Sequence, residues 1–228
     1  MHHSIAILLF AQNAKKDALH KKKSWSSTLR QTTTVFESLT KRTLQTVTAT
    51  QLPFFLSSDL CEGVDSFSSQ LAMSVKAVFE KGFQSVICIG NDCPELTSEL
   101  LQKTAIQLQN GKSVVGPDNR GGAYLIGIQK EGFQAEVFEN LPWQTAQLQE
   151  SLVQMLGDKT GLLPAFADIN AEIDLHLWAK ETKPYPSFAQ LLLSLLVQLF
   201  PVADFQPIFN SSFYSTSYRL RPPPAVLL

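Results

Sequence analysis

Short apolar runs rich in β-formers alternate with longer segments of helical periodicity along this chain of 228 residues. Residues 5–10, 85–90 and 123–128 are such runs, whereas Leu71 and Val75 recur at the spacing of a helix face. Strands that alternate with helices of this length predict βαβ units with helices on both faces of the sheet. The expected fold is therefore α/β, with three layers (αβα) and a mainly parallel, mixed sheet.

The same patterns place the individual elements. Besides the three runs above, we expect a strand at 113–115 and one or two short strands at 47–56, interrupted at Pro53. Residues 11–23 are predicted to be a polar, lysine-rich loop, and a long helix is expected to begin at a cap formed by Ser26 or Ser27. Further helices are expected at 94–110, 145–156 and 187–200, and Gly82 is expected to cap the helix before 85–90.

Charge and cysteine content narrow the classes of function. The formal net charge is −1, which provides no general attraction to nucleic acid or to an anionic membrane. The three cysteines have neither disulfide-framework nor zinc-site spacing, which favours a reduced, cytoplasmic setting. The most apolar segment, 188–200, is shorter than the roughly 20 residues of a membrane span. We expect one main domain at 1–182 and, at 183–228, an apolar helix and irregular tail packed on that domain or on a second copy in a homodimer.

One candidate site residue follows the apolar run 85–90. Asp92 is predicted to lie just past the carboxyl end of a strand, where open α/β sheets bind ligands. A carboxylate there can hold Mg²⁺ or Mn²⁺, which can bridge the oxygens of a diphosphate. The alternative interpretation is that Asp92 caps a helix that begins at Pro94, and the two roles are compatible.

A second candidate segment is the loop between the strands expected at 113–115 and 123–128. It contains Gly116, Pro117, Arg120, Gly121 and Gly122. Adjacent glycines allow the backbone to approach a ligand closely, although an ordinary glycine turn explains them as well.

These segments resemble a known family. Residues 89–94 (IGNDCP), Gly116-Pro117, 120–123 (RGGA), 125–127 (LIG) and the pair Trp143 and Thr145 match, in order, the motifs of the glycosyltransferase-like family associated with radical-SAM or selenium-domain genes. The resemblance implies the nucleotide-diphospho-sugar transferase fold, called GT-A, and a distant relationship to the molybdenum cofactor guanylyltransferases. It covers about residues 5–178 and is strongest from 86 to 145.

The resemblance implies site residues as well. Asp92 would hold Mg²⁺ or Mn²⁺, and the nucleotide or substrate would contact Asn91, Gly116, Pro117, Arg120, Gly121, Gly122, Trp143 and Thr145. For Trp143, a packing role is the alternative.

The chain also departs from the family pattern. Arg120 stands where the family has an aspartate and Ala123 where it has a tyrosine, and residues 11–23 lack the glycine-containing motif expected after the first strand. Arg120 would make the loop favour a phosphate over a divalent ion. Lys15, Lys16 and residues 21–23 are candidate phosphate contacts, with a solvated basic loop as the alternative.

Two functions from different classes follow. The first is metal-dependent transfer of a glycosyl or nucleotidyl group from a nucleotide sugar or nucleotide, with Asp118, Asp168 and Asp174 as candidates for a catalytic base. The second is a catalytically degenerate relative that binds a phosphorylated ligand or a protein partner.

Overall fold

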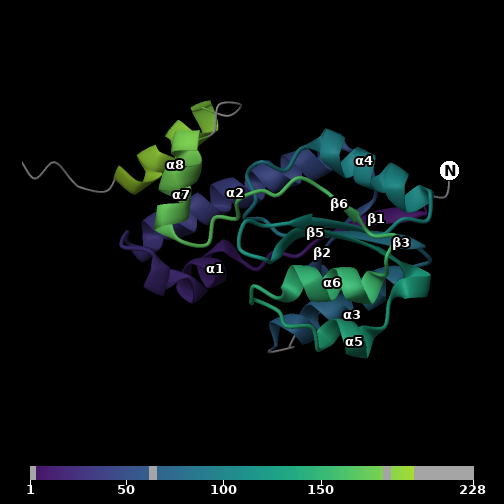
Figure 1. The fold of residues 1–228 in the computed structure, drawn as a ribbon. Helices are drawn as coiled ribbons and strands as arrows, with labels where there is room; N and C mark the ends of the chain where they lie inside the picture. Colours follow the sequence, from purple (N-terminus) through teal and green to yellow (C-terminus); the bar gives the residue numbers. More distant parts are fainter. Residues whose placement is uncertain (1–3, 62–65, 182–185, 198–228) are drawn as a thin grey trace, which may run out of the picture.

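The computed structural model describes residues 4–61, 66–181 and 186–197 of the chain (Figure 1). Within these residues, one six-stranded sheet has the order β2-β1-β3-β5-β4-β6. Its strands are β1 (Ile5–Leu9), β2 (Phe54–Leu56), β3 (Ser85–Ile89), β4 (Val114–Pro117), β5 (Ala123–Gln129) and β6 (Gly161–Leu162). Strand β5 is antiparallel to β3 and β4, whereas the other neighbouring pairs are parallel. The predicted α/β class with a mainly parallel, mixed sheet is confirmed.

Helices cover both faces of this sheet. They are α1 (Ala14–His20), α2 (Leu29–Ala49), α3 (Phe67–Glu80), α4 (Ser98–Gln109), α5 (Ala135–Glu139), α6 (Leu148–Leu156), α7 (Glu172–Glu181) and α8 (Pro186–Val197). Helices α3, α5 and α6 lie on one face, and α4 with part of α2 lies on the other (Figure 1). The three predicted layers are therefore present.

Strand β1, which lies between β2 and β3, shows why these layers form. All five of its side chains are buried. Because successive side chains of a strand point to opposite faces, Ile7 joins the apolar cluster under α4, whereas Leu8 joins the cluster under α3. A strand that is apolar on both faces requires a helical layer on each.

A third apolar cluster lies beyond the carboxyl edge of the sheet, where helices α1, α7 and α8 gather around the first half of α2 (Figure 1). Phe36 of α2, Leu175 of α7 and Leu192 of α8 are fully enclosed there. This cluster places α1 and α7 on opposite sides of the strand ends and so positions the candidate site. The predicted division of the chain at 182/183 stays a prediction, and so does the homodimer; the predicted tail after Val197 lies outside the described residues.

Several predicted element boundaries are wrong. Helix α1 occupies the segment predicted to be a loop, and α2 is capped by Thr28 with a capping box to Gln31 rather than by Ser26 or Ser27. Val47 belongs to α2, so 47–56 contains only the strand β2. Helices α4 and α6 begin later than predicted, at Ser98 and Leu148, and α5, α7 and β6 were not predicted.

The start of helix α4 shows whether Asp92 is a helix cap. Its cap is Thr97, whose side chain accepts a hydrogen bond from the backbone N–H of Leu100. Asp92 lies five residues before this cap, and Pro94 is not helical. The interpretation of Asp92 as the cap of a helix starting at Pro94 is therefore wrong. No described helix is both long and apolar enough to cross a membrane.

Glu172 joins α7 to the start of α2. Its Oε2 accepts hydrogen bonds at 2.9 Å from the backbone N–H and hydroxyl of Ser26 and from the backbone N–H of Ser27. Partial burial acts to raise the pKa of Glu172, but these hydrogen bonds outweigh it and lower the pKa below its usual 4.5.

We expect Glu172→Ala to lower the free energy of unfolding by about 1 kcal/mol, the net value of such hydrogen bonds at a partly exposed site. Because the folded pKa is depressed, this contribution is present above the unfolded pKa and disappears as the pH falls through the folded value. Urea unfolding at pH 7 and pH 3 measures both effects. An equal loss at the two pH values would contradict the ionic role of Glu172.

Candidate functional site

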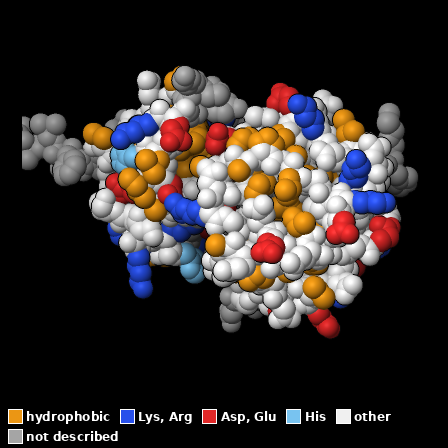
Figure 2. All heavy atoms as spheres, viewed as in Figure 1, with side chains coloured by type: hydrophobic (Ala, Val, Ile, Leu, Met, Phe, Trp, Pro, Cys, Tyr) orange, Lys and Arg blue, Asp and Glu red, His pale blue; other side chains and the backbone are white. Residues whose placement is uncertain are grey.

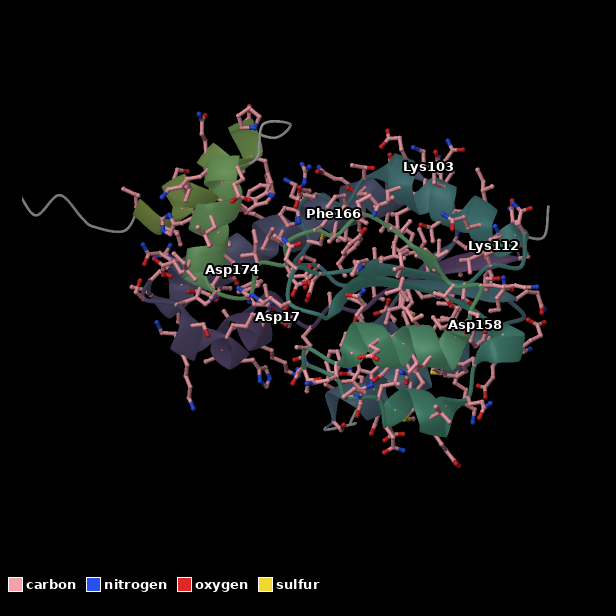
Figure 3. The ribbon with its side chains drawn as sticks, in the orientation of Figure 1. Asp17, Lys103, Lys112, Asp158, Phe166 and Asp174 are labelled. Carbon is pink, nitrogen blue, oxygen red and sulfur yellow. The ribbon has the colours of Figure 1, made fainter. Side chains whose placement is uncertain are left out.

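Three aspartates meet at the carboxyl edge of the sheet. Asp92 follows β3 and Asp118 follows β4, two strands that run in the same direction. Asp168 reaches the same place because the backbone N–H of Phe166 donates to Pro117 O at 3.2 Å and that of the residue after Asp168 donates to Asp92 O at 2.8 Å. The edge at which open α/β sheets bind ligands thus carries three carboxylates. Figure 3 shows Asp17, Phe166 and Asp174 at this end and Lys103, Lys112 and Asp158 at the other.

Asp168 is the most perturbed of the three. Its Oδ1 is enclosed and has no hydrogen-bond partner among the described residues. Burial raises the pKa of Asp168 well above its usual range, and the negative charges of Asp92 and Asp118 raise it further. A buried carboxylate oxygen without a partner, beside two like charges, indicates a place where a bound cation would be stabilised.

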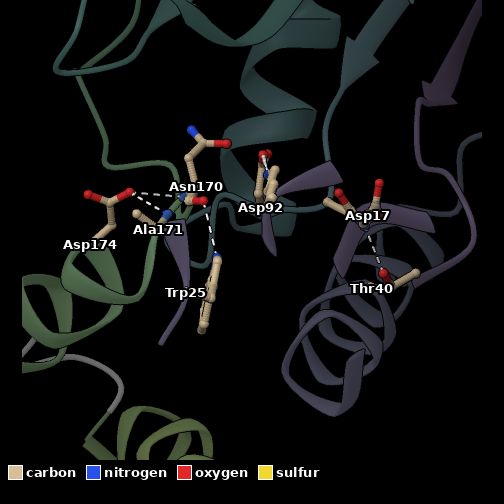
Figure 4. Close-up of polar contacts among 9 residues, drawn as sticks. Asp17, Trp25, Thr40, Asp92, Asn170, Ala171 and Asp174 are labelled. Atoms are coloured by element: carbon tan, nitrogen blue, oxygen red, sulfur yellow. Dashed lines mark hydrogen bonds and ion pairs between the residues drawn. The ribbon is translucent and has the colours of Figure 1, made fainter. Parts of the chain in front are cut away.

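Asp92 has a basic partner from outside the sheet. The Lys21 ammonium, at the end of α1, lies 2.8 Å from Asp92 Oδ2. The Lys21 Nζ also lies 4.9 Å from the centre of the Phe36 ring, within cation–π distance. Side chains of both partners are about one-fifth to one-quarter exposed, at 24% for Lys21 and 21% for Asp92. In Figure 4, Asp92 lies between Asp17 and the segment that contains Asn170 and Asp174.

Asn91 connects the end of β3 to the first two helices. Its buried amide Nδ2 donates to Asp17 Oδ2 at 3.1 Å and to Thr40 Oγ1 at 2.9 Å. Burial raises the pKa of Asp17, and the nearby charge of Asp92 adds to the rise, against the lowering effects of Asn91 and Lys21. The amide N–H groups of Asn91 are therefore used inside the protein, and its predicted substrate contact stays a prediction.

The predicted glycine loop forms a tight turn shaped by Asp118. Asp118 Oδ1 accepts hydrogen bonds from the backbone N–H groups of Arg120 at 2.6 Å and Gly122 at 2.8 Å. A Cβ on Gly116 would lie 2.5 Å from the Tyr124 ring, and one on Gly122 would lie 2.4 Å from Asp118 Oδ2. A side chain at either position would clash with the protein itself, so the glycines are explained without a ligand. Contact of Gly116, Pro117, Gly121 or Gly122 with a nucleotide stays a prediction.

Arg120 pairs with a carboxylate from α7. Its guanidinium donates to Asp174 Oδ1, and Asp174 Oδ2 accepts from the backbone N–H groups of Asn170 at 3.0 Å and Ala171 at 2.8 Å. Without a partner, the positive charge of Arg120 would disfavour a divalent ion. Because Asp174 offsets that charge, the expected preference for phosphate over a cation does not follow from Arg120.

A cleft of about 480 Å³ opens beside these groups. It lies between the strand ends and α7, and charged side chains border this part of the surface in Figure 2. Its charged lining residues are Glu95, Asp118, Arg120, Asp168, Asp174 and Glu181, and Leu177 and Trp178 supply an apolar wall. The volume suits a small molecule, and the lining combines an apolar wall with polar groups in the manner of ligand sites.

Trp143 and Thr145 lie in the connection between α5 and α6. The Trp143 ring packs edge-on against Phe67 and Phe138, with centroids 5.7 Å and 4.9 Å apart, and its Nε1 donates to Phe138 O. Thr145 donates to Pro142 O at 2.7 Å. These contacts support the packing interpretation of Trp143, and the predicted substrate contacts of both residues stay predictions.

The residues at this edge fit a divalent ion that is only partly coordinated by protein. Among the described residues, no group of three or more His, Cys, Asp and Glu side chains is arranged to hold a metal. Mg²⁺ is usually bound by one or two carboxylates, with water and substrate phosphates completing its coordination. Asp92 and Asp168, with its unpartnered oxygen, satisfy that lesser requirement. The thiol of Cys93 is buried and its pKa is raised well above the usual value, so it is a poor nucleophile.

Sequence reasoning missed Asp17 and Glu95 as parts of this edge, and it did not pair Lys21 with Asp92. Asp17 lies on α1, a segment predicted to be a loop, so no periodicity suggested its direction. Glu95 Oε2 accepts from the backbone N–H of Ala167 at 3.4 Å, a contact across 72 positions. No local pattern signals such contacts.

Comparisons with known proteins agree with this architecture. A crystal structure from Desulfovibrio desulfuricans G20, titled "putative nucleotide-diphospho-sugar transferase", matches with a TM-score of 0.65 at 20% identity, over 86% of this chain and 98% of that chain. Rv0371c from Mycobacterium tuberculosis H37Rv matches with a TM-score of 0.50 at 11% identity, over 79% of this chain and 100% of that chain. These likenesses show the fold. No curated protein matches in sequence.

The family comparison covers most of β1, the strand ends that carry Asp92 and Asp118, and the connection that contains Trp143, whereas Asp168 lies beyond it. The model of the family described as "Uncharacterized protein conserved in bacteria (DUF2064)" matches residues 7–145, more than half of the chain. The chain therefore belongs to the DUF2064 family and shares its fold with the Desulfovibrio desulfuricans protein titled "putative nucleotide-diphospho-sugar transferase".

Proposed function

We propose that this protein binds an activated nucleotide at the carboxyl edge of the sheet and transfers its glycosyl or nucleotidyl group to an acceptor in the adjacent cleft. The observation that carries the proposal is the enclosed, unpartnered Oδ1 of Asp168 beside Asp92 and Asp118. The fold likeness to the Desulfovibrio protein titled "putative nucleotide-diphospho-sugar transferase" supports it. The proposed kinship with the GT-A enzymes and the molybdenum cofactor guanylyltransferases rests on the motif resemblance.

In this proposal Asp92 and Asp168 hold Mg²⁺ or Mn²⁺. The ion would supply positive charge to the phosphate oxygens as the bond to the leaving group breaks. Asp118 keeps the turn 118–122 in place through its two backbone hydrogen bonds, and Arg120 with Asp174 holds α7 as the far wall of the cleft. The carboxylates lining that wall suit an acceptor that donates hydrogen bonds, such as a hydroxyl or amine compound.

A specific observation favours a second function, a degenerate binding module. Residues 14–20 form helix α1 instead of a glycine-containing loop, and Lys21 at its end already pairs with Asp92. A chain that keeps the fold but closes its site in this way would bind a phosphorylated ligand or a protein without catalysing transfer.

Thermal-shift screening distinguishes the two. The protein is heated with ADP, CDP, GDP, UDP and their sugar derivatives, each with Mn²⁺, with Mg²⁺ and with EDTA. A nucleotide at 100 times its dissociation constant stabilises the fold by about 2.7 kcal/mol. We expect one nucleotide class to stabilise the protein only when metal is present. Stabilisation that is equal in EDTA favours the binding module, and no response to any nucleotide contradicts the transferase.

A further inference from the structure

Lys21 occupies the carboxylate to which the proposed function assigns a metal. Its Nζ lies 2.8 Å from Asp92 Oδ2, and the two side chains are mostly shielded from water. An oxygen that coordinates Mg²⁺ lies about 2.0–2.1 Å from the ion. An ammonium and a divalent ion on the same carboxylate oxygen would be separated by only a few ångströms, and their repulsion disfavours simultaneous binding.

Backbone and side-chain hydrogen bonds around Lys21 hold it in position to pair with Asp92. Lys21 follows the last residue of α1, and its backbone N–H bonds to Asp17 O and Leu19 O. Asp17 is in turn bound to Asn91, the neighbour of Asp92, at 3.1 Å. The backbone of Lys21 is therefore anchored to the segment that carries Asp92, and the Phe36 ring supports the ammonium from α2.

The surrounding charges show that Lys21 is an incomplete substitute for a metal. Its ammonium pairs with Asp92 at 2.8 Å, and Asp17, one turn earlier, is bound to Asn91 beside Asp92. Yet the enclosed Asp168 Oδ1 has no hydrogen-bond partner among the described residues. One ammonium satisfies Asp92 and leaves Asp168 unsatisfied, whereas a divalent ion would serve both.

We propose that Lys21 is an internal counter-ion that competes with the divalent metal for Asp92, and that metal binding releases its ammonium from that carboxylate. This inference rests on the proposed metal site at Asp92 and Asp168. The competition lowers the affinity of the free protein for metal. The released ammonium remains at the same strand end, where it is available to the phosphates that arrive with the nucleotide.

The test measures Mn²⁺ affinity without nucleotide, by titration calorimetry and by the loss of the free Mn²⁺ electron-paramagnetic-resonance signal. The proteins are the wild type, Lys21→Met, Lys21→Gln and Asp92→Asn, with Lys23→Met as the matched control because Lys23 is an exposed lysine of the same segment. We expect Lys21→Met to bind Mn²⁺ about tenfold more tightly than the wild type, and Lys23→Met to match the wild type.

A second readout is the melting temperature, which is compared without metal and with saturating Mn²⁺. In EDTA, Lys21→Met should melt at a lower temperature than the wild type because Asp92 loses its partner, and saturating Mn²⁺ should remove the difference. Lys21→Gln, which keeps a hydrogen-bond donor without the charge, provides the same comparison if Lys21→Met does not fold, and its Mn²⁺ affinity should rise as well.

The outcomes separate this inference from the proposed function. If Asp92→Asn abolishes Mn²⁺ binding while Lys21→Met and Lys21→Gln bind as weakly as the wild type, the metal site stands and the competition is wrong. Weaker binding by the Lys21 variants would also overturn it. If the wild type and every variant fail to bind Mn²⁺, both proposals are wrong.

Discussion

Asp92→Asn is expected to weaken metal-dependent nucleotide binding at least about a hundredfold, which corresponds to about 2.7 kcal/mol. Asparagine has the shape of aspartate but lacks its negative charge, so it is a poor ligand for Mg²⁺ or Mn²⁺. Asp92 is the carboxylate at the end of β3, and its neighbour Asp168 has an enclosed oxygen that a cation would satisfy. Titration calorimetry with Mn²⁺ and the nucleotide found by the thermal-shift screen measures the change.

Asp158→Asn is the matched control for that experiment. Asp158 is an exposed aspartate at the opposite end of the sheet from the candidate site (Figure 3). The substitution removes the same charge from the protein, so general electrostatic attraction changes equally in both variants. Equal effects of Asp92→Asn and Asp158→Asn would contradict a specific role of Asp92.

Gly121→Ala is expected to have the largest effect on stability, lowering the free energy of unfolding by about 3 kcal/mol. Gly121 has φ +85, a backbone conformation that costs an L-residue about 1–2 kcal/mol. In addition, an added Cβ would lie 2.2 Å from the backbone oxygen of Ala146, and Gly121 O accepts a hydrogen bond at 2.8 Å from the backbone N–H of Gln149. The turn therefore cannot move without disturbing the start of α6.

Gly82→Ala separates the conformational cost of a positive φ from the cost of the clash with Ala146. Gly82 has a similar φ of +97, but a Cβ there would meet nothing within 4 Å. It should lose only the conformational part, about 1–2 kcal/mol. Urea unfolding of both variants gives the difference, which is assigned to the contact with Ala146. An equal loss of unfolding free energy in both variants would show that the backbone at Ala146 moves away from the added Cβ without destabilising the protein.

Except for the two-residue β6, the strands were predictable because their signals are local. The run 85–90 is apolar, β-branched and closed by glycine, and it became the central strand β3. Gly82 was expected to cap the preceding helix, and its positive φ agrees with that role. Helix α1 was missed because a single residue, Ala18, is buried in it, so its sequence lacks an apolar stripe. The start of α4 was misplaced because residues after β3 are held by distant partners: Lys21 for Asp92 and Arg42 for the carbonyl of Pro94.

The candidate site was predictable in part for the same reason. Asp92 and Asp118 follow strands directly, so the rule for strand ends places them at one edge. The perturbation of Asp168 depends on contacts across some 50 to 76 positions, from Asp118 and Asp92, which no spacing reveals. For Arg120, the sequence shows that an arginine replaces the aspartate of the family motif. It does not show that Asp174, 54 positions later, pairs with that arginine.

The position of bound manganese is the decisive observation for the proposed site at Asp92 and Asp168. Crystals of the protein grown with Mn²⁺ and a nucleoside diphosphate would be measured for anomalous scattering, which locates manganese. We expect a peak between the carboxylates of Asp92 and Asp168, in contact with phosphate oxygens, with the Lys21 ammonium moved away from Asp92. A nucleotide bound elsewhere, or bound at this edge with no manganese beside Asp92, would contradict it.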